Sequence, residues 1–197
     1  MKAFDAYVCD FSRETLSKLS GLGYEGMVYA RDYGKGFEKK KAMPEPKLDV
    51  LTAAVLDGKI QSQAPKALNQ ADLVYVKSSD QKALRQACES WDVDAVCSPE
   101  LASKRDPLNQ RDGGLDDVCF KFMGERGIAY MLLLSTILAE YGGRRSLLLD
   151  RARQNLRLAE KYGVTVVYAS GAPNRWGLRS PRDLAGIESI LGVQTGL

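Results

Sequence analysis

The sequence predicts an α/β barrel in which about seven parallel strands are surrounded by helices. Short runs rich in apolar and β-branched residues alternate with segments of helical periodicity, and this alternation is typical of parallel sheets. Several of the runs are apolar throughout, which indicates a sheet covered on both faces. Seven such units in 197 residues fit a compact barrel better than an open sheet, and we expect residues 1–197 to form a single domain.

The strands are assigned to short runs rich in apolar, β-branched and aromatic residues. In chain order they cover residues 3–9, 26–30, 48–56, 72–77, 93–97, 128–134 and 165–168. The alanines of the third run leave a helix possible there. The sixth run is apolar along its whole length, so we expect it to be buried on both faces of the sheet.

The helices are assigned from capping residues and from apolar side chains at helical spacing. They are expected after Ser12, at 64–69, from Ser79 to Ser90, at 116–125, before Tyr141, at 146–162 and after Ser180. Gly142-Gly143 is expected to break the chain before the sixth of these helices, and Gly163 to end that helix. Its apolar face opposes Arg153, Arg157 and Lys161, which we interpret as the solvent-exposed side of an amphipathic helix.

Composition excludes several classes of site. The chain has no histidine, which rules out a Ser-His-Asp triad and any metal centre built on imidazole. Its four cysteines show no Cys-x-x-Cys spacing, as expected for reduced thiols in an intracellular protein. No apolar run approaches the roughly 20 residues that cross a bilayer. We therefore expect a soluble, cytoplasmic protein that does not bind a membrane.

Two enzymatic interpretations stay open. Lys77 lies at the carboxyl end of a predicted strand, where a buried lysine could form a Schiff base with a carbonyl substrate. Five carboxylates could supply oxygen ligands to Mg²⁺, although no spacing demands this and capping roles are favoured. They are Asp5, Asp92, Asp94, Asp116 and Asp117. Either site would make the chain a free-standing barrel enzyme that acts on a phosphorylated small molecule.

Positive charge is distributed unevenly along the chain. The formal net charge is only +3, yet residues 141–182 contain nine Lys or Arg and two acidic residues. This segment therefore carries +7 and the rest of the chain −4. Such an asymmetry suggests a polyanionic partner, and a solvated charged surface is the alternative.

In a barrel, the loops after the second, fourth, fifth and seventh strands share one rim, where ligands of such folds usually bind. These loops, including the glycine- and lysine-rich loop 31–47, carry most of the candidates for binding a nucleic acid, and the last helix adds one. The candidates are Lys35, Lys39, Lys40, Lys41, Lys77, Lys104, Arg105, Arg111, Arg175, Arg179 and Arg182. Phosphates would complement such a rim, because each neutralised phosphate releases counterions. Trp176 could stack on a base, contact a partner protein or anchor its loop in the core.

The sequence also resembles a known family. Three segments carry the resemblance: FDAYVCD at 4–10, RQNLRLAEKYGV at 153–164 and ASGAPNRWGLRSPRDLAGIESILG at 169–192. They are similar to archaeal ribonuclease P protein component 3, the homologue of the eukaryotic thirty-kilodalton ribonuclease P subunit. The likeness covers most of the chain in order and length, and it is most specific in the carboxyl-terminal third.

This resemblance implies a barrel related to the polymerase-and-histidinol-phosphatase metal-dependent phosphoesterases. Those enzymes begin with Asp-x-His-x-His on the first strand, whereas here Asp5 is followed by Tyr7 and Cys9 at the two histidine positions. The resemblance therefore implies a barrel that has lost this metal site, binds no cofactor and contributes no catalytic residue. In ribonuclease P the RNA and its Mg²⁺ free the 5′ leader of precursor tRNA.

The resemblance also implies a set of partners. They are the ribonuclease P RNA, protein component 2 in a heterotetramer of two copies of each protein, the other ribonuclease P proteins, and precursor tRNA as substrate. We expect a subunit that binds RNA and, with component 2, stabilises its active fold. The alternatives are the barrel enzyme described above and a sequence-independent RNA-binding module unrelated to tRNA processing.

Overall fold

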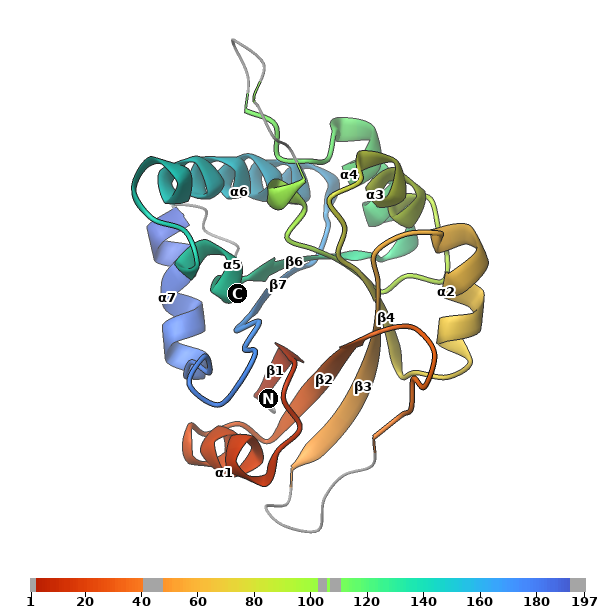
Figure 1. The fold of residues 1–197 in the computed structure, drawn as a ribbon. Helices are drawn as coiled ribbons and strands as arrows, with labels where there is room; N and C mark the ends of the chain where they lie inside the picture. Colours follow the sequence, from red (N-terminus) through yellow and green to blue (C-terminus); the bar gives the residue numbers. More distant parts are fainter. Residues whose placement is uncertain (1–2, 41–47, 103–105, 107–110, 192–197) are drawn as a thin grey trace.

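The computed structural model describes residues 3–40, 48–102, 106 and 111–191. In these parts seven parallel strands form one sheet in sequence order, and β1 lies close to β7, so that the sheet curls into a nearly closed barrel (Figure 1). The strands are β1 (Phe4–Val8), β2 (Gly26–Asp32), β3 (Asp49–Leu56), β4 (Leu73–Val76), β5 (Ala95–Cys97), β6 (Ala129–Leu133) and β7 (Val166–Ala169). The predicted fold class is confirmed.

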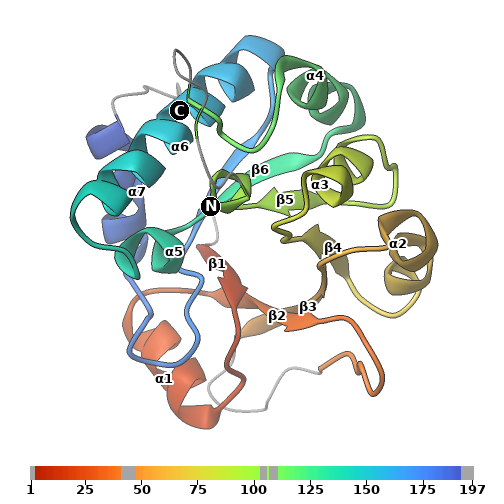
Figure 2. The same ribbon diagram turned by 45° about the horizontal axis from the view of Figure 1, so that its top comes forward.

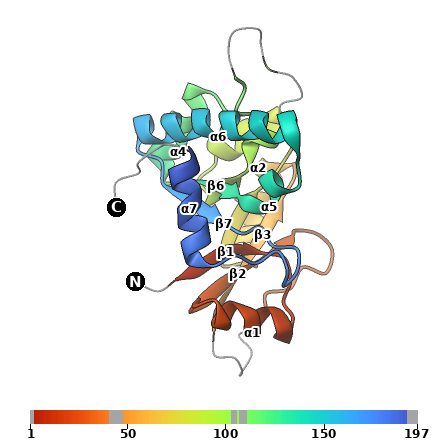
Figure 3. The ribbon, with the colours of Figure 1, turned by 90° about the vertical axis from the view of Figure 1, so that its left-hand side faces the viewer.

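Helices cover the outside of the barrel (Figures 1 and 2). They are α1 (Arg13–Gly21), α2 (Ile60–Leu68), α3 (Gln81–Cys88), the 3₁₀ helix η1 (Pro99–Leu101), α4 (Asp117–Arg126), α5 (Leu134–Leu138), α6 (Gly142–Tyr162) and α7 (Pro181–Leu191). In Figure 3, α7 runs beside the barrel and one of its ends approaches α6. Within the described parts of the chain, no helix combines the length and the hydropathy that a membrane crossing needs.

Alternation along the strands separates two apolar layers. Side chains that point into the barrel form a small inner core, in which alanines such as Ala53 and Ala95 leave room for the rings of Tyr7 and Tyr75. These two rings stack with their centroids 6.1 Å apart. The outward-pointing side chains form a larger core beneath the helices, with Phe120 and Leu156 among its fully buried members. Both faces of the sheet are therefore covered, as the apolar runs predicted.

A seam between β1 and β7 closes the barrel. Val8 forms a single parallel bridge with Ala172, and the Cys9 N–H donates to the Ala172 carbonyl at 2.9 Å. Asp5, which is fully buried, extends this connection, because its carboxylate accepts the N–H of Ser170 at 3.1 Å and that of Tyr7 at 3.3 Å. A side chain thus takes the place of a backbone acceptor at the seam.

Aspartates at the amino ends of β4 and β5 join those strands to their neighbours. The carboxylate of Asp72 accepts the Thr52 N–H at 2.9 Å, and that of Asp94 accepts the Val74 N–H at 2.7 Å. In return, the Asp72 N–H donates to the Thr52 carbonyl and the Asp94 N–H donates to the Val74 carbonyl. Asp94 therefore has a structural role.

Local signals predicted most helix ends correctly. Ser12 caps α1, Gly163 ends α6 in the left-handed conformation, and the Ser180 hydroxyl accepts the Asp183 N–H at 3.2 Å where α7 begins at Pro181. Three predictions were wrong. The helix expected at 64–69 begins four residues earlier, because α2 starts at Ile60. Asp80 caps α3 in place of Ser79, and α6 begins at Gly142, so that Gly142-Gly143 opens the helix that it was expected to precede.

Candidate functional site

The candidate site lies on the loop from β7 to α7 at the carboxyl end of the barrel. Its first turn requires small residues, because Gly171 has φ +64° and a Cβ there would lie 2.3 Å from the Ser135 hydroxyl oxygen. Ala172 then completes the seam with Val8. The loop is therefore held by the barrel at its start and by the α7 cap at its end.

The middle of the loop presents an aromatic ring with cations beside it. Trp176 is 69% exposed. The Arg175 guanidinium carbon lies 4.7 Å from the centroid of its ring, and the Lys18 ammonium of α1 lies 5.2 Å from it. Arg175 also forms an ion pair with Glu14. Of the three roles left open for Trp176, that of an anchor in the core does not fit this exposure, and Leu178, which is buried, has that role.

Arg179 and Arg182 surround the start of α7. Arg179 donates to the carbonyls of Trp176 and Leu178 at 3.2 and 2.9 Å, so its half-buried guanidinium stiffens the loop. Hydrogen bonds from Ser180 hold the pKa of the Asp183 carboxyl below its ordinary value, which keeps this cap ionised. The structure thus brings together the three arginines predicted from the sequence. Arg182 is exposed, whereas Arg175 and Arg179 are half-buried.

Lys77 lies at the mouth of the barrel, apart from this loop. Its ammonium sits 5.8 Å from the centroid of the Tyr7 ring and faces a cavity of about 380 Å³ that Asp32, Asp57 and Ser98 help to line. The predicted rim position is confirmed.

The same mouth shows why the metal site of the resembling phosphoesterases does not fit this chain. Tyr7 turns a stacked ring into the barrel where the first histidine would be, and the Lys77 ammonium lies over it. Partial desolvation raises the pKa of the Cys9 thiol at the second position, although the residue is exposed, and this shift disfavours the thiolate that binds metals. Asp5 is engaged in the seam. Among the residues that the structure describes, no three His, Cys, Asp or Glu side chains are grouped to hold a metal ion.

The other aspartates considered as Mg²⁺ ligands lie elsewhere. Asp116 caps α4 by accepting the Cys119 N–H at 2.8 Å. Asp117, on the surface, pairs with Lys161 at 2.8 Å. Asp92 lies in the bend before β5. With Asp94 on the sheet, these carboxylates do not form one site.

The lysines of loop 31–47 do not all lie on the rim. Lys35 is exposed in a turn just after β2. Lys39, however, pairs with Asp72 at the amino end of β4, and the Lys40 N–H donates to Thr52 on the outer face of β3 at 3.0 Å. The expectation of a shared rim is wrong for these two, because the connection from β2 to β3 must return along the outside of the barrel. Lys41 lies outside the described residues.

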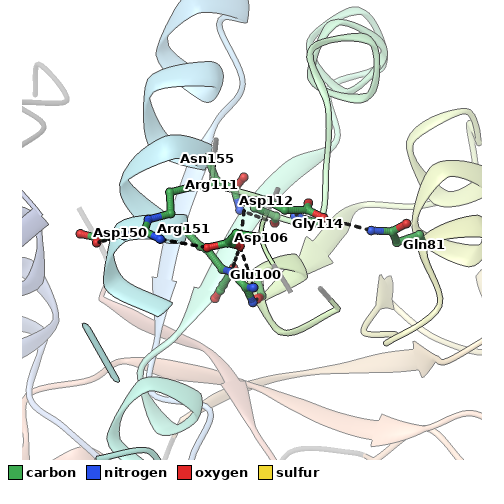
Figure 4. Close-up of polar contacts among 10 residues, drawn as sticks. Gln81, Glu100, Asp106, Arg111, Asp112, Gly114, Asp150, Arg151 and Asn155 are labelled. Atoms are coloured by element: carbon green, nitrogen blue, oxygen red, sulfur yellow. Dashed lines mark hydrogen bonds and ion pairs between the residues drawn. The ribbon is translucent and has the colours of Figure 1, made fainter. Parts of the chain in front are cut away.

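Arg111 belongs to a polar network between η1 and α6 (Figure 4). It contacts Asp106 at 3.2 Å and Asp150 at 3.4 Å, while the buried Arg151 holds the other oxygen of Asp106 at 2.7 Å. Hydrogen bonds from Asp112 and Arg151 lower the pKa of the Asp106 carboxyl despite its desolvation. Arg111 is therefore an anchor of its loop as well as a surface charge. Lys104 and Arg105 lie outside the described residues.

The basic side chains of α6 differ in their surroundings. Arg153 donates to the carbonyls of Leu191 and Ile190 at 3.3 and 3.1 Å, and so satisfies the carboxyl end of α7. Arg157 is exposed, as expected. Lys161 is exposed and pairs with Asp117.

Two contacts were not predicted from the sequence: Arg153 as a cap of α7 and Lys18 as a neighbour of Trp176. A signal for Lys18 existed, since Glu14 and Lys18 share one face of α1 by their spacing.

The chain is similar to known proteins over nearly its whole length. The family model for RNase P subunit p30 matches residues 3–196. Ribonuclease P protein component 3 of Methanosarcina acetivorans is 31% identical over 188 residues, which cover 93% of this chain and 75% of the relative. The protein of the same name from Methanococcus maripaludis strain S2 is 28% identical over 185 residues, with 89% and 77% covered.

Solved structures agree with these matches. A chain from the cryo-EM structure of archaeal ribonuclease P with mature tRNA has a TM-score of 0.80 and 25% identity, and the match covers 96% of this chain and 83% of that one. Histidinol phosphate phosphatase from Lactococcus lactis, complexed with zinc, L-histidinol and phosphate, has a TM-score of 0.56 and 10% identity over 96% and 92% of the two chains. The second likeness concerns the fold alone.

Proposed function

This chain belongs to the RNase P subunit p30 family, and we propose that it acts as a protein subunit of ribonuclease P that assists the catalytic RNA in removing the 5′ leader from precursor tRNA. The observation that carries this proposal is the match of the family model to residues 3–196. The similarity to a chain of archaeal ribonuclease P, at a TM-score of 0.80, supports it. This function is favoured over that of a free-standing barrel enzyme.

The proposed contribution of the protein is electrostatic. RNA helices that pack against one another repel through their phosphates, and basic side chains between them reduce the Mg²⁺ needed to hold them together. The basic loop between β7 and α7 can supply such charges, and Lys35, Lys77, Arg111 and Arg157 extend them to other parts of the surface. Lys41, Lys104 and Arg105, which lie outside the described residues, belong to the same proposal.

In this proposal the chain itself does not cleave RNA. Mg²⁺ is used by the catalytic RNA, and the protein holds no cofactor. The ring of Tyr7, the Lys77 ammonium above it and the raised pKa of Cys9 support this division of roles, because they suit neither metal binding nor a water activated by a metal.

The family resemblance supports the choice of partners. We propose that the chain binds ribonuclease P RNA and protein component 2, in a heterotetramer of two copies each, together with the other ribonuclease P proteins and precursor tRNA. We place this assembly in the cytoplasm. The free thiols of Cys9, Cys88, Cys97 and Cys119 are consistent with a reducing compartment.

Reconstitution tests the proposal. The cognate RNA is assembled with component 2, with and without this chain, and 5′ cleavage of precursor tRNA is measured across Mg²⁺ concentrations. We expect the chain to lower the Mg²⁺ concentration at half-maximal rate. A variant with Arg175, Arg179 and Arg182 replaced by Ala should lose part of this effect, and a control with the exposed Lys66, Lys82 and Lys121 replaced should lose less. An unchanged Mg²⁺ requirement with the wild-type chain would refute the function.

A further inference from the structure

The ring of Trp176 is exposed although its backbone is fixed. The Trp176 N–H donates to the Asn174 side chain at 2.9 Å, and the Gly177 N–H donates to the Asn174 carbonyl at 3.0 Å. Arg179 holds the carbonyl of Trp176 from the other side at 3.2 Å. A large apolar side chain is thus presented to solvent by a rigid turn, and binding a ligand over it would cost little ordering entropy.

The groups beside the ring indicate what would cover it. Lys18 from α1 and Arg175 from the loop lie over the ring, and Arg182 is exposed in the first turn of α7. Positive charge next to an exposed aromatic face suits a ligand that has both a π-system and an anionic backbone. A nucleotide in a single-stranded segment combines these two features, whereas a paired base keeps its faces stacked within the helix.

The second tryptophan provides a comparison. Trp91 is also exposed, at 74%. Its ring contacts Arg126, whose side chain is only 15% exposed and also packs on Phe122 at 4.6 Å. The cation beside Trp91 is therefore part of the protein's own packing, whereas Lys18 and Arg175 are at least partly open to solvent.

We propose that Trp176 is a stacking platform for one unpaired base of RNA, with Lys18 and Arg175 contacting the phosphates on either side of that base. The inference rests on the proposed function and makes it more specific: the loop binds a single-stranded segment or a bulge of RNA, and not only the backbone of a helix. On binding, Arg175 would exchange its pairing with Glu14 for a phosphate.

Fluorescence of one tryptophan tests this directly. In the full-length Trp91→Phe variant the emission comes from Trp176 alone, because the chain has two tryptophans. A ten-nucleotide oligoadenylate is added at low salt, and a blunt RNA duplex of the same length serves as the control. We expect strong quenching by the single strand and weak quenching by the duplex. Equal quenching by both would overturn the stacking proposal.

Affinity measurements on three further variants complete the test. Trp176→Ala should weaken binding of the single strand by roughly 5- to 150-fold, the range of one lost base stack. Trp176→Phe should recover most of that loss, and Trp91→Ala should bind as the wild type does. Equal affinities for Trp176→Ala and the wild type would overturn the inference.

Two outcomes separate this inference from the proposed function. If the reconstituted enzyme depends on the chain but the Trp176 emission responds to component 2 and not to RNA, the ring is a protein contact and the inference alone fails. If the reconstituted enzyme does not depend on the chain at all, the proposed function fails, whatever the fluorescence shows.

Discussion

The carboxylate of Asp5 accepts the backbone N–H of Ser170 at 3.1 Å, and so joins the first strand to the turn that follows the last. Both residues are buried, and the second oxygen of Asp5 has no hydrogen-bond partner among the described residues. Burial raises the pKa of Asp5 above its ordinary value, although the hydrogen bonds from Ser170 and Tyr7 act against this shift. The seam therefore depends on a carboxylate whose burial is only partly compensated by hydrogen bonds.

Replacing Asp5 should show this dependence. Asp5→Ala leaves the N–H groups of Ser170 and Tyr7 without their acceptor, and we expect it to lower the free energy of unfolding by about 2 kcal/mol. Asp5→Asn keeps an acceptor oxygen and should cost less. Urea unfolding monitored by circular dichroism measures both, with Asp57→Ala as an exposed control. Equal losses for the Ala and Asn variants would contradict the role of the acceptor.

The raised pKa of Glu100 should make the stability of the protein depend on pH. Glu100 is fully buried, accepts the Tyr130 hydroxyl at 3.1 Å, and burial raises its pKa to about 7. Since the folded pKa lies above the unfolded one, Glu100 contributes its full stability only below about pH 4.5, the unfolded value, and this contribution is lost as the pH rises to about 7.

Glu100→Gln should therefore be more stable than the wild type at pH 8, by about 1–3 kcal/mol, and should lose that advantage near pH 5. Urea unfolding at the two pH values gives the comparison. Tyr130→Phe is a useful second variant, because it removes the hydrogen bond to Glu100 without changing the carboxyl group. An advantage of the Gln variant that does not change with pH would contradict this account of Glu100.

The ion pair of Arg151 with Asp106 should contribute far more to the free energy of unfolding than that of Arg111 with the same carboxylate. The Arg151 side chain is 3% exposed and that of Arg111 is 52% exposed. Arg151→Met leaves a nearly buried carboxylate with only the exposed Arg111 and the Asp112 N–H as partners, and we expect a loss of about 3 kcal/mol. Arg111→Met should cost at most about 1 kcal/mol. Thermal and urea unfolding of both variants would settle the order, and similar losses would contradict it.

The arginines around the β7–α7 loop should determine the salt dependence of RNA binding. If Arg175, Arg179 and Arg182 each contact a phosphate, the slope of log affinity against log salt should become shallower by about 2–3 when all three are replaced by Ala. The variant with Lys66, Lys82 and Lys121 replaced has the same net charge and should change the slope less. An unchanged slope for the arginine variant would leave these residues with structural roles only.

The parts of the fold that follow local chemistry were predictable. Gly163 and the Ser180-Pro181 pair determine helix ends through their own backbone preferences, and the structure places both as predicted. Gly142-Gly143 shows the limit of such signals. Glycine is tolerated in the first turn of a helix, and in this chain Arg145 donates to the carbonyls of Glu140 and Leu138 and so stabilises the helix start.

The candidate site was predictable only in part, because its geometry depends on contacts between distant segments. The sequence places Arg175, Trp176 and Arg179 on one loop, but Lys18 reaches the Trp176 ring only when α1 packs beside that loop. Lys39 illustrates the opposite error. It follows β2 in the sequence, yet its partner Asp72 belongs to the far end of the barrel, since a parallel connection must return along the sheet before the next strand begins.

The seam also constrains the order in which the chain can fold during its synthesis. Asp5 and Ser170 are 165 residues apart, so the ribosome must release nearly all of the described chain before the two can meet. The β1–β2–β3 layer can pair early, but its edge at β1 stays open until the last strand arrives, and an open strand edge is a site for wrong pairing. The stretch of translation between β3 and β7 is therefore when a nascent chain of this fold is most exposed to aggregation and most in need of a chaperone.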